Sequence, residues 1–325
     1  MTAYDVTAFG ESMLRLSVPV GERLARAARF DATIGGAESN VLGALAQLGR
    51  RCGWFSALPA NALGELVAQQ FRAVGIDLAG VVWRPQGRVG TYFVEHATSP
   101  RSAQVIYDRA GSCVAQLTSD QVDWSRLLDT RLLHLTGITP ALSQSCRLIV
   151  TEAIRRARAA GVPVSFDINF RARLWPEGEA ASILGPLAEG AALLFCSQTD
   201  ARRLFGISGE PEQVAGALAG RFGADCVVVS AADAGVIVWE VGATGQSPLL
   251  LRQPAYPVVT VDRLGAGDAL AAGVIHGWLD GDLATGLRYG ALLAALALTQ
   301  HGDMVVTNQG ELAALLAEGG GGISR

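Results

Sequence analysis

The sequence predicts an α/β fold in which a mainly parallel sheet is covered by helices. From residue 132 onward, short apolar runs rich in β-formers alternate with longer segments of helical pattern, as parallel strands joined by crossover helices require. The same rhythm occurs near the start of the chain, at residues 6–9, 37–48 and 51–57. The later strands are expected at 132–135, 164–166, 193–196 and 226–229, and the helices at 143–160, 199–205 and 211–221.

Two stretches break this rhythm and predict a small second sheet. Residues 12–33 and 84–112 lack a helical pattern, and the second stretch contains strand-like runs at 89–95 and 104–107. We expect these stretches to pair as a lid beside the main sheet. Residues 1–318 are then one domain that carries this lid, and the glycine-rich tail at 319–325 is expected to be disordered.

Composition narrows the classes of ligand and compartment. The 325 residues are half apolar, and 26 basic against 30 acidic residues give a net charge of −4. That balance does not favour a nucleic acid partner, so an anionic ligand must meet a local cationic pocket. The five cysteines are scattered without metal-ligand spacing, which indicates buried thiols in a reducing compartment. No signal-peptide pattern opens the chain.

The most apolar helix candidate, residues 289–298, is ten residues long. A membrane span needs roughly 20 apolar residues. This segment therefore indicates a buried core helix, and a cytoplasmic protein without membrane contact is expected.

The most informative segment is a glycine-rich turn that leads into a helix. It reads Val261-Asp262-Arg263-Leu264-Gly265-Ala266-Gly267-Asp268, and an apolar helical pattern follows at 269–279. Small residues let the backbone approach a phosphate, and the unpaired N–H groups of a first helical turn point toward it. Gly265, Ala266 and Gly267 are therefore candidates for an anion hole.

Asp268 stands at the mouth of this anion hole, within reach of an incoming hydroxyl group. A carboxylate with an ordinary pKa of about 4 does not ionise an alcohol beforehand, but it can accept the proton late, as the new P–O bond forms. The competing interpretation of Asp268 is a plain helix N-cap, and the glycine string alone favours that interpretation.

A second glycine pair precedes the helix expected at 37–48. The segment reads Gly35-Gly36-Ala37-Glu38-Ser39-Asn40. Gly35 and Gly36 allow a close approach of the backbone, and Asn40 offers both a donor and an acceptor to a polyol. Taken alone, an ordinary turn with a polar cap explains this segment better.

Together the two segments resemble the paired signatures of the PfkB, or ribokinase-like, family of carbohydrate kinases, over nearly the whole chain. Within that family, four segments are similar to 2-keto-3-deoxygluconate kinases, namely residues 36–40, 133–143, 167–171 and 174–175. The resemblance implies a ribokinase-like, three-layer Rossmann-like domain with a β-sheet lid, ATP with Mg²⁺, and a homodimer formed through the lids. It also implies that Asp268 is the catalytic base and that Gly36 and Asn40 face the sugar.

The substrate that the resemblance implies is 2-keto-3-deoxygluconate, phosphorylated at its terminal C6 hydroxyl. Its carboxylate requires a fixed cation, for which arginine is the best partner. Arg109 and Arg171 match positions that contact the ligand in these kinases. Asp167 and Asn169 are expected beside Arg171, because ligands bind at the strand ends of open α/β sheets. A salt bridge between Arg171 and Asp167 is the alternative.

Two tyrosines of the expected lid, Tyr92 and Tyr107, are candidates to close over the sugar. Ordinary packing within the lid sheet explains them equally well.

Two segments depart from the family pattern on the ATP side. Ser197-Gln198-Thr199-Asp200 stands where relatives carry Asn-x-x-Glu, so Asp200 keeps a charge for indirect contact with Mg²⁺ while Ser197 loses the amide. Residues 230–235 stand where kinases often show Lys or Thr and an earlier glycine. The expected ATP contacts are Ser197, Ser230, Gly235, Gly265 and Gly267. The sequence does not decide whether a monovalent cation binds near Asp262.

Other functions stay open. These departures suit a non-catalytic sugar-binding regulator, and a fructokinase or ribokinase would need no carboxylate clamp. A dinucleotide-dependent dehydrogenase is disfavoured, because no G-x-G-x-x-G follows the first strand. The sequence does not separate the gluconate substrate from its galactonate epimer.

Overall fold

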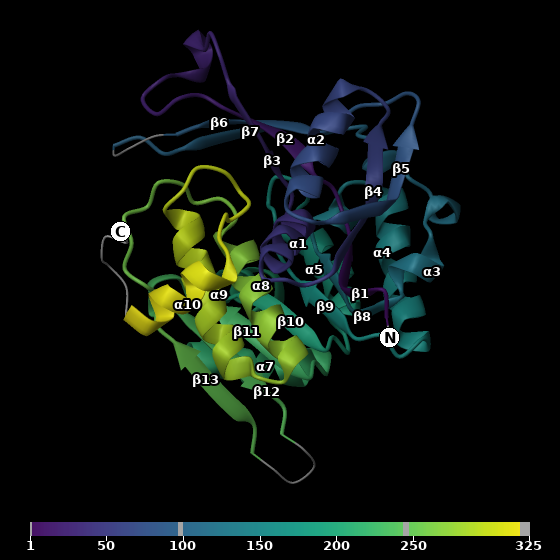
Figure 1. Ribbon diagram of the computed structural model, residues 1–325. Helices are drawn as coiled ribbons and strands as arrows, with labels where there is room; N and C mark the ends of the chain where they lie inside the picture. The colour runs from purple at the N-terminus through teal and green to yellow at the C-terminus, as the bar shows by residue number, and fades with distance from the viewer. Residues whose placement is uncertain (1, 97–99, 243–246, 319–325) are drawn as a thin grey trace.

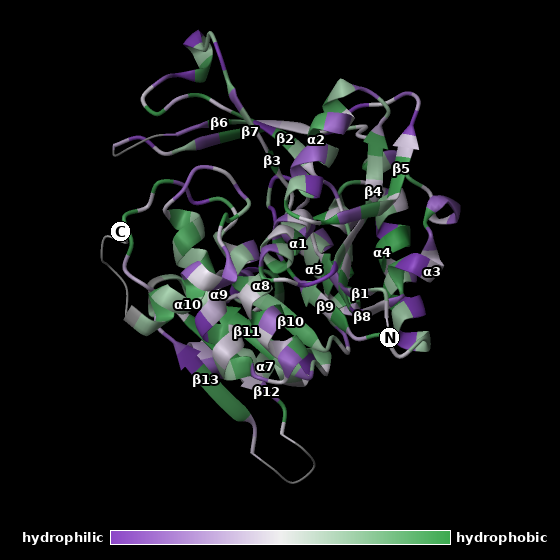
Figure 2. Ribbon diagram, viewed as in Figure 1, coloured by the Kyte–Doolittle hydropathy of each residue, from purple (hydrophilic) through white to green (hydrophobic). Residues whose placement is uncertain are grey.

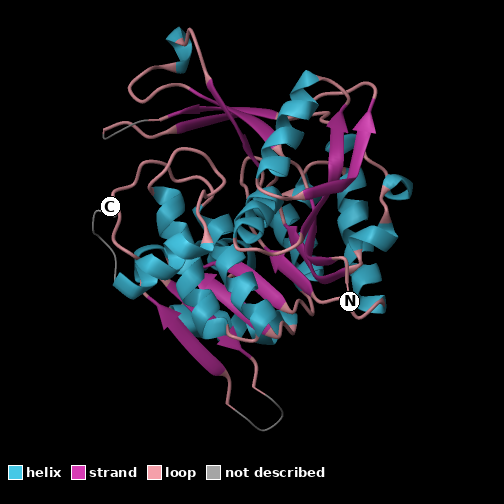
Figure 3. Ribbon diagram, in the orientation of Figure 1, coloured by secondary structure: helices cyan, strands magenta, loops and turns pink. Residues whose placement is uncertain are grey.

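The computed structural model describes residues 2–96, 100–242 and 247–318, and within them it contains two sheets (Figures 1 and 3). The larger sheet has nine strands, and every neighbouring pair from β5 to β11 is parallel, whereas β12 and β13 extend the sheet in antiparallel pairing. Across this sheet the strands are β13 (Leu249–Gln253), β12 (Val236–Glu240), β11 (Cys226–Ser230), β10 (Leu193–Ser197), β9 (Val164–Asp167), β8 (Thr130–Thr136), β1 (Tyr4–Phe9), β4 (Cys52–Pro59) and β5 (Asp77–Arg84).

Helices cover both faces of the large sheet, so its strands are buried on both sides, as is usual for parallel sheets. Along β10, Leu193 and Phe195 pack into one apolar core, and Leu194 and Cys196 pack into the other. The first core is closed by α1 (Ala37–Gln47), α2 (Ala62–Ala73), α8 (Ala266–Asp280), α9 (Leu283–Leu298) and α10 (Gln309–Glu318). The second is closed by α4 (Gln144–Ala159), α5 (Glu177–Ala188), α6 (Gln198–Phe205) and α7 (Pro211–Phe222).

Hydrophobic residues concentrate in the central strands and the helices beside them (Figure 2). Short turns of helix complete the described elements, namely α3 (Trp124–Leu127), η1 (Leu24–Arg26), η2 (Val114–Gln116), η3 (Ser119–Gln121), η4 (Thr139–Ala141) and η5 (Ala232–Ala234). All five cysteines are buried free thiols, as the sequence predicts.

The four strands of the second sheet form the lid, in the order β3 (Asp31–Gly35), β2 (Met13–Ser17), β6 (Thr91–Glu95) and β7 (Gln104–Asp108). This confirms the small sheet that residues 12–33 and 84–112 predict. It projects from one end of the main body, at the top of Figure 1. The tail at 319–325 lies outside the described residues, so its expected disorder stays a prediction.

Every strand and helix expected from the sequence is present, and the ends differ by a few residues. The largest difference is α9, which begins at Leu283 rather than at residue 289. No helix in the described parts of the chain is both long enough and apolar enough to cross a membrane. The outer strands β5 and β13 were not expected; most of their positions are exposed or partly buried, although both contain three consecutive apolar residues.

Candidate active site

Three adjoining cavities lie where the parallel strands end. The lid cavity, of about 420 Å³, lies between the lid and the body. The strand-end cavity, of about 240 Å³, lies at the ends of β9, β10 and β11. The α9 cavity, of about 420 Å³, lies between the β11–β12 turn and α9. Asp268 and Gly265 line both the lid cavity and the strand-end cavity, while Gly267 lines the strand-end cavity and the α9 cavity.

The glycine turn before α8 has the backbone that an anion hole needs. Gly265 is the N-cap of α8 with a φ of 82°, a left-handed conformation that favours glycine. A Cβ atom at this position would lie 1.8 Å from the carbonyl oxygen of Asp303, so no side chain fits. The first N–H groups of α8, from Ala266 and Gly267 onward, have no partner within the helix. This turn borders the strand-end cavity, because Gly265 and Gly267 both line it.

Asp268 is held in the first turn of α8, where it is 7% exposed. The Asn40 amide donates a hydrogen bond to its Oδ2 atom at 2.7 Å. Burial raises the pKa of Asp268 to about 7, although the Asn40 hydrogen bond and the charge of Arg171 lower it. The ordinary pKa assumed from the sequence is therefore wrong, and the folded protein makes Asp268 a stronger base. Gly265, and not Asp268, is the N-cap.

The first glycine pair lines the lid cavity together with Asn40. Gly35 ends β3, and Gly36 is the N-cap of α1. A Cβ atom on Gly35 would lie 2.1 Å from the Tyr92 hydroxyl oxygen, and one on Gly36 would lie 2.1 Å from the carbonyl oxygen of Glu11. Both positions thus require glycine because neighbouring atoms approach closely.

The two lid tyrosines face each other across β6 and β7 and both line the lid cavity. Their ring centroids are 5.6 Å apart and the rings are nearly parallel. Tyr92 is buried, and its hydroxyl lies beside the Asp303 carboxylate. Tyr107 is 39% exposed. A polar ligand in the lid cavity would therefore find a hydroxyl group and an aromatic wall.

The two predicted clamp arginines differ in their present partners. Arg109 lies in the lid cavity, where its Nε atom donates to Glu11 Oε2 at 2.6 Å. Arg171 lines both the lid cavity and the strand-end cavity. Among the ion pairs of the described residues none involves Arg171, so the alternative salt bridge to Asp167 is not formed. Arg171 is thus available to an anion, whereas Arg109 already neutralises a buried carboxylate.

Asp167 and Asn169 lie on the strand-end cavity rather than on the lid cavity. The sequence grouped them with the sugar contacts, but of the three residues only Arg171 lines the lid cavity as well. Asp167 accepts hydrogen bonds from the backbone and the amide of Asn169, at 3.1 and 3.3 Å. Burial and the charges of Asp268 and Asp200 raise the pKa of Asp167 to about 8. Burial also raises the pKa of Asp200.

Ser197 and Ser230 line both the strand-end cavity and the α9 cavity. Ser197 caps α6, and its hydroxyl accepts a hydrogen bond from the Asp200 backbone N–H at 3.0 Å. Gly235 lines the α9 cavity with a φ of 90°. Much of the remaining wall is small and apolar, formed by alanines of α9 and of the preceding loops.

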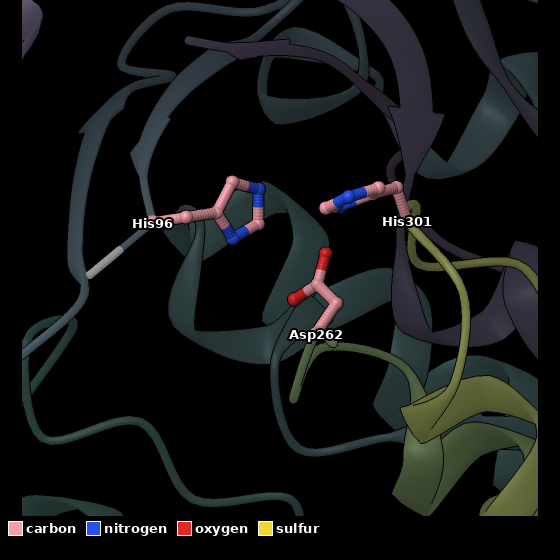
Figure 4. Close-up of side chains that lie close together, drawn as sticks. All are labelled: His96, Asp262 and His301. Atoms are coloured by element: carbon pink, nitrogen blue, oxygen red, sulfur yellow. The ribbon is translucent and has the colours of Figure 1, made fainter. Parts of the chain in front are cut away.

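A buried arginine joins the lid to the loops behind the anion hole. Arg15 of β2 is 1% exposed; its guanidinium pairs with Asp262 and, at 2.6 Å, with Asp303. Its Nη2 atom also lies 3.2 Å from His96 Nε2. His96, Asp262 and His301 bring potential metal ligands within 4.8 Å of one another (Figure 4). Because Arg15 already places a positive charge between His96 and Asp262, this group does not fit a metal ion.

Sequence reasoning assigned no role to several charged residues around the site. Glu11 and Asp303 line the lid cavity, and Arg15 fixes Asp303. Glu38 is buried and accepts hydrogen bonds from the hydroxyls of Thr136 and Thr139, at 2.9 and 2.6 Å. Only Glu38 carried a sequence signal, because it stands inside the second glycine segment. The others become neighbours only through the fold.

Comparisons with known proteins agree with this geometry. Residues 3–309 match the family model described as pfkB family carbohydrate kinase. The 2-dehydro-3-deoxygalactonokinase of Haloferax volcanii is 35% identical over all of both chains. The 2-dehydro-3-deoxygluconokinase of Bacillus subtilis is 31% identical, over 92% of this chain and 91% of its own. The crystal structure of 2-dehydro-3-deoxygluconokinase from Thermotoga maritima superposes with a TM-score of 0.87 at 34% identity, over 97% and 99% of the chains. The chain belongs to the pfkB family of carbohydrate kinases and is a sugar kinase.

Proposed function

We propose that this kinase transfers the γ-phosphate of ATP to the C6 hydroxyl of 2-keto-3-deoxygluconate. The observation that carries the proposal is the position of Asp268, which lies between the backbone anion hole and the lid cavity and borders both. The names of the relatives support a 2-keto-3-deoxy sugar acid as the substrate class. The free guanidinium of Arg171 supports an anionic sugar in particular.

Asp268 acts as the base in this proposal. With a pKa of about 7, a large fraction of the carboxyl groups is ionised at neutral pH and can accept the proton of the hydroxyl group. The Asn40 amide fixes the orientation of the carboxylate through the bond to Oδ2. The proton moves to Asp268 as the oxygen bonds to phosphorus and the bond to the ADP leaving group breaks. The N–H groups at the start of α8 stabilise the negative charge on the transferred phosphoryl group.

ATP lies, in this proposal, along the strand-end and α9 cavities, with its base against the alanines of α9. Mg²⁺ fits the strand-end cavity, because Asp167 and Asp200 both line it with carboxylate oxygens and neither forms an ion pair among the described residues. These two residues would hold the ion, with Asp200 acting indirectly, and the ion would neutralise phosphate charge. A monovalent cation beside Asp262 is no part of the proposal, because Arg15 neutralises that carboxylate.

The sugar acid occupies the lid cavity, with its carboxylate toward Arg109 and Arg171 and its polyol chain against Asn40 and Tyr92. A dimer through the lids belongs to the proposal as well. Exposed apolar side chains on lid segments, Val20, Phe30 and Ile106, support it.

The alternative is a sugar-binding regulator without turnover, which the small hydroxyls of Ser197 and Ser230 favour. A fructokinase or ribokinase activity is the nearer alternative. An ADP-release assay decides among them, with Mg-ATP and 2-keto-3-deoxygluconate, 2-keto-3-deoxygalactonate, fructose or ribose. We expect turnover of the keto acids, with the gluconate preferred.

The matched control for this assay is Asp268→Asn, which keeps the shape of the side chain and removes the base. Turnover restricted to neutral sugars would contradict the substrate assignment. Binding of keto acid without any ADP release would favour the regulator.

A further inference from the structure

The strand-end cavity contains a cationic side chain that the mechanism above does not use. Arg263 lies in the loop before the anion hole and lines this cavity but not the lid cavity. It is exposed, and neither an ion pair nor a hydrogen bond of its guanidinium occurs among the described residues. Arginines without any partner are expected at sites that receive an anion, because the guanidinium fork matches phosphate and carboxylate geometry.

Few other cations are available to a nucleotide here. The chain contains no lysine, so all 26 basic side chains are arginines. Of the residues that line the strand-end and α9 cavities, only Arg171 and Arg263 are cationic. Arg171 also reaches the lid cavity, where the sugar acid is proposed to bind. Arg263 is therefore the cation that serves the nucleotide side alone.

The cavity needs such a charge, because three carboxylates line it. Asp167, Asp200 and Asp268 all line it, and none of the three forms an ion pair among the described residues. In their ionised forms these carboxylates repel a polyphosphate, and backbone N–H groups offer only partial positive charge. A full positive charge on the wall of the same cavity would offset this repulsion.

The loop that carries Arg263 is fixed on both sides. Asp262 accepts a hydrogen bond from the Leu264 backbone N–H at 3.2 Å and pairs with buried Arg15. Gly265 begins α8 immediately after this loop. The backbone beside Arg263 is thus held in place while its side chain lies at the cavity wall, so binding has to order the side chain and not the loop.

We propose that Arg263 binds the phosphate groups of the nucleotide in the strand-end cavity. The proposal rests on the proposed use of ATP by this site, and it gives Arg171 and Arg263 different ligands. Arg171 serves the sugar acid, and Arg263 serves the nucleotide. Arg263 is a binding residue that determines nucleotide affinity, and it takes no part in moving the proton.

The test compares ADP binding by calorimetry in the full-length protein and in three variants. Arg263→Gln removes the positive charge, and Arg263→Lys keeps a positive charge without the planar guanidinium group. Arg288→Gln is the matched control, because Arg288 is exposed on α9 and its side chain bonds only to Thr285 among the described residues. We expect the ADP Kd to rise by about tenfold or more in Arg263→Gln, with Arg263→Lys between that value and the wild type. The control should stay within about twofold.

Steady-state kinetics supplies a readout that a purely structural role would not produce. The KM for ATP should rise in Arg263→Gln while the KM for the keto acid and the thermal midpoint stay near the wild-type values. A rise of the ADP Kd by less than about fivefold, or an equal rise of both KM values, would overturn the proposal. A wild type that binds ADP but phosphorylates no keto acid would defeat the proposed function and leave the ADP comparison decisive. A wild type that does not bind ADP would defeat both.

Discussion

The lid cavity and the strand-end cavity meet at Asp268, but their charges are balanced in different ways. In the lid cavity, acidic side chains already have cationic partners, since Glu11 pairs with Arg109 and Asp303 pairs with Arg15. In the strand-end cavity, Asp167, Asp200 and Asp268 form no ion pair among the described residues, and their pKa values are raised by burial. The carboxylates Glu11 and Asp303 are thus paired with arginines, whereas those of the strand-end cavity have no ion-pair partner among the described residues.

This difference suits the two ligands proposed for these cavities. An anionic sugar must enter a cavity whose carboxylates are neutralised, or it would be repelled. A nucleotide that brings Mg²⁺ supplies charge to carboxylates that lack it. Asp268 belongs to both sides: burial raises its pKa, and its Asn40 contact comes from the lid-cavity wall.

The largest expected effect follows from removing the group that the two cavities share. Asp268→Asn should lower kcat by about 1,000-fold, because a positioned base is lost while the shape is kept. In the wild type, kcat/KM should rise with pH through about 7, where Asp268 loses its proton. The measurement is a pH series of the ADP-release assay, with ADP affinity as the control for folding. A variant that retains more than a tenth of the wild-type rate would be inconsistent with a base at this position.

The next largest effect is on the free energy of unfolding, and it follows from removing the buried cation Arg15. Arg15→Gln would leave Asp262 and Asp303 buried without their partner, so the free energy of unfolding should fall by about 3 to 5 kcal/mol. Arg29→Gln is the matched control, because Arg29 pairs with Glu22 between two strands of the same lid and both side chains are exposed. Its cost should stay below about 1 kcal/mol. Equal costs in urea unfolding would show that burial of the Arg15 pairs is unimportant.

Substitution of Arg109 or Arg171 should have a smaller effect, on the KM for the keto acid. The two variants should differ because only Arg109 already pairs with a carboxylate. Arg171→Gln should raise the KM for 2-keto-3-deoxygluconate by about 10- to 100-fold, because a charge-assisted contact to the carboxylate is lost. Arg109→Gln should do the same and also leave Glu11 unpaired beside the anionic substrate. The double variant Arg109→Gln, Glu11→Gln should therefore recover part of the affinity. Arg202→Gln, on the exposed surface of α6, is the control. An unchanged keto-acid KM would remove that arginine from the clamp.

The smallest expected effect is on the free energy of unfolding, which the buried Asp268 carboxylate lowers when it is ionised. The folded pKa of Asp268 is about 7, against about 3.9 in an unfolded chain. Protonated Asp268 therefore makes its full contribution to the stability of the folded protein below the unfolded pKa. This contribution is lost as the pH rises through about 7. Asp268→Asn should increase the free energy of unfolding by at least about 1 kcal/mol at about pH 8, and by less at about pH 5. Chemical denaturation at both pH values checks this, and a pH-independent difference would contradict the raised pKa.

Local signals allowed the parallel sheet, the lid and the catalytic turn to be predicted from the sequence. Gly265 and Asp268 could be found because their spacing is dictated by the first turn of one helix. Arg15 and Asp303 could not, because they are 288 positions apart and meet only in the folded chain. The raised pKa of Asp268 was missed for the same reason, since burial by surrounding elements causes it. Asp167 and Asn169 were expected on the sugar side because strand ends predict a site but not which of two adjoining cavities a side chain faces.

The position of the phosphate in the product tests the proposed reaction most directly. The wild type is incubated with Mg-ATP and 2-keto-3-deoxygluconate, and the product is examined by ³¹P and ¹³C NMR. We predict that the wild type forms one phosphomonoester whose phosphorus couples to C6. This product should be absent with Asp268→Asn over the same incubation. A phosphate on any other carbon, or the same product from Asp268→Asn at the wild-type rate, would contradict it.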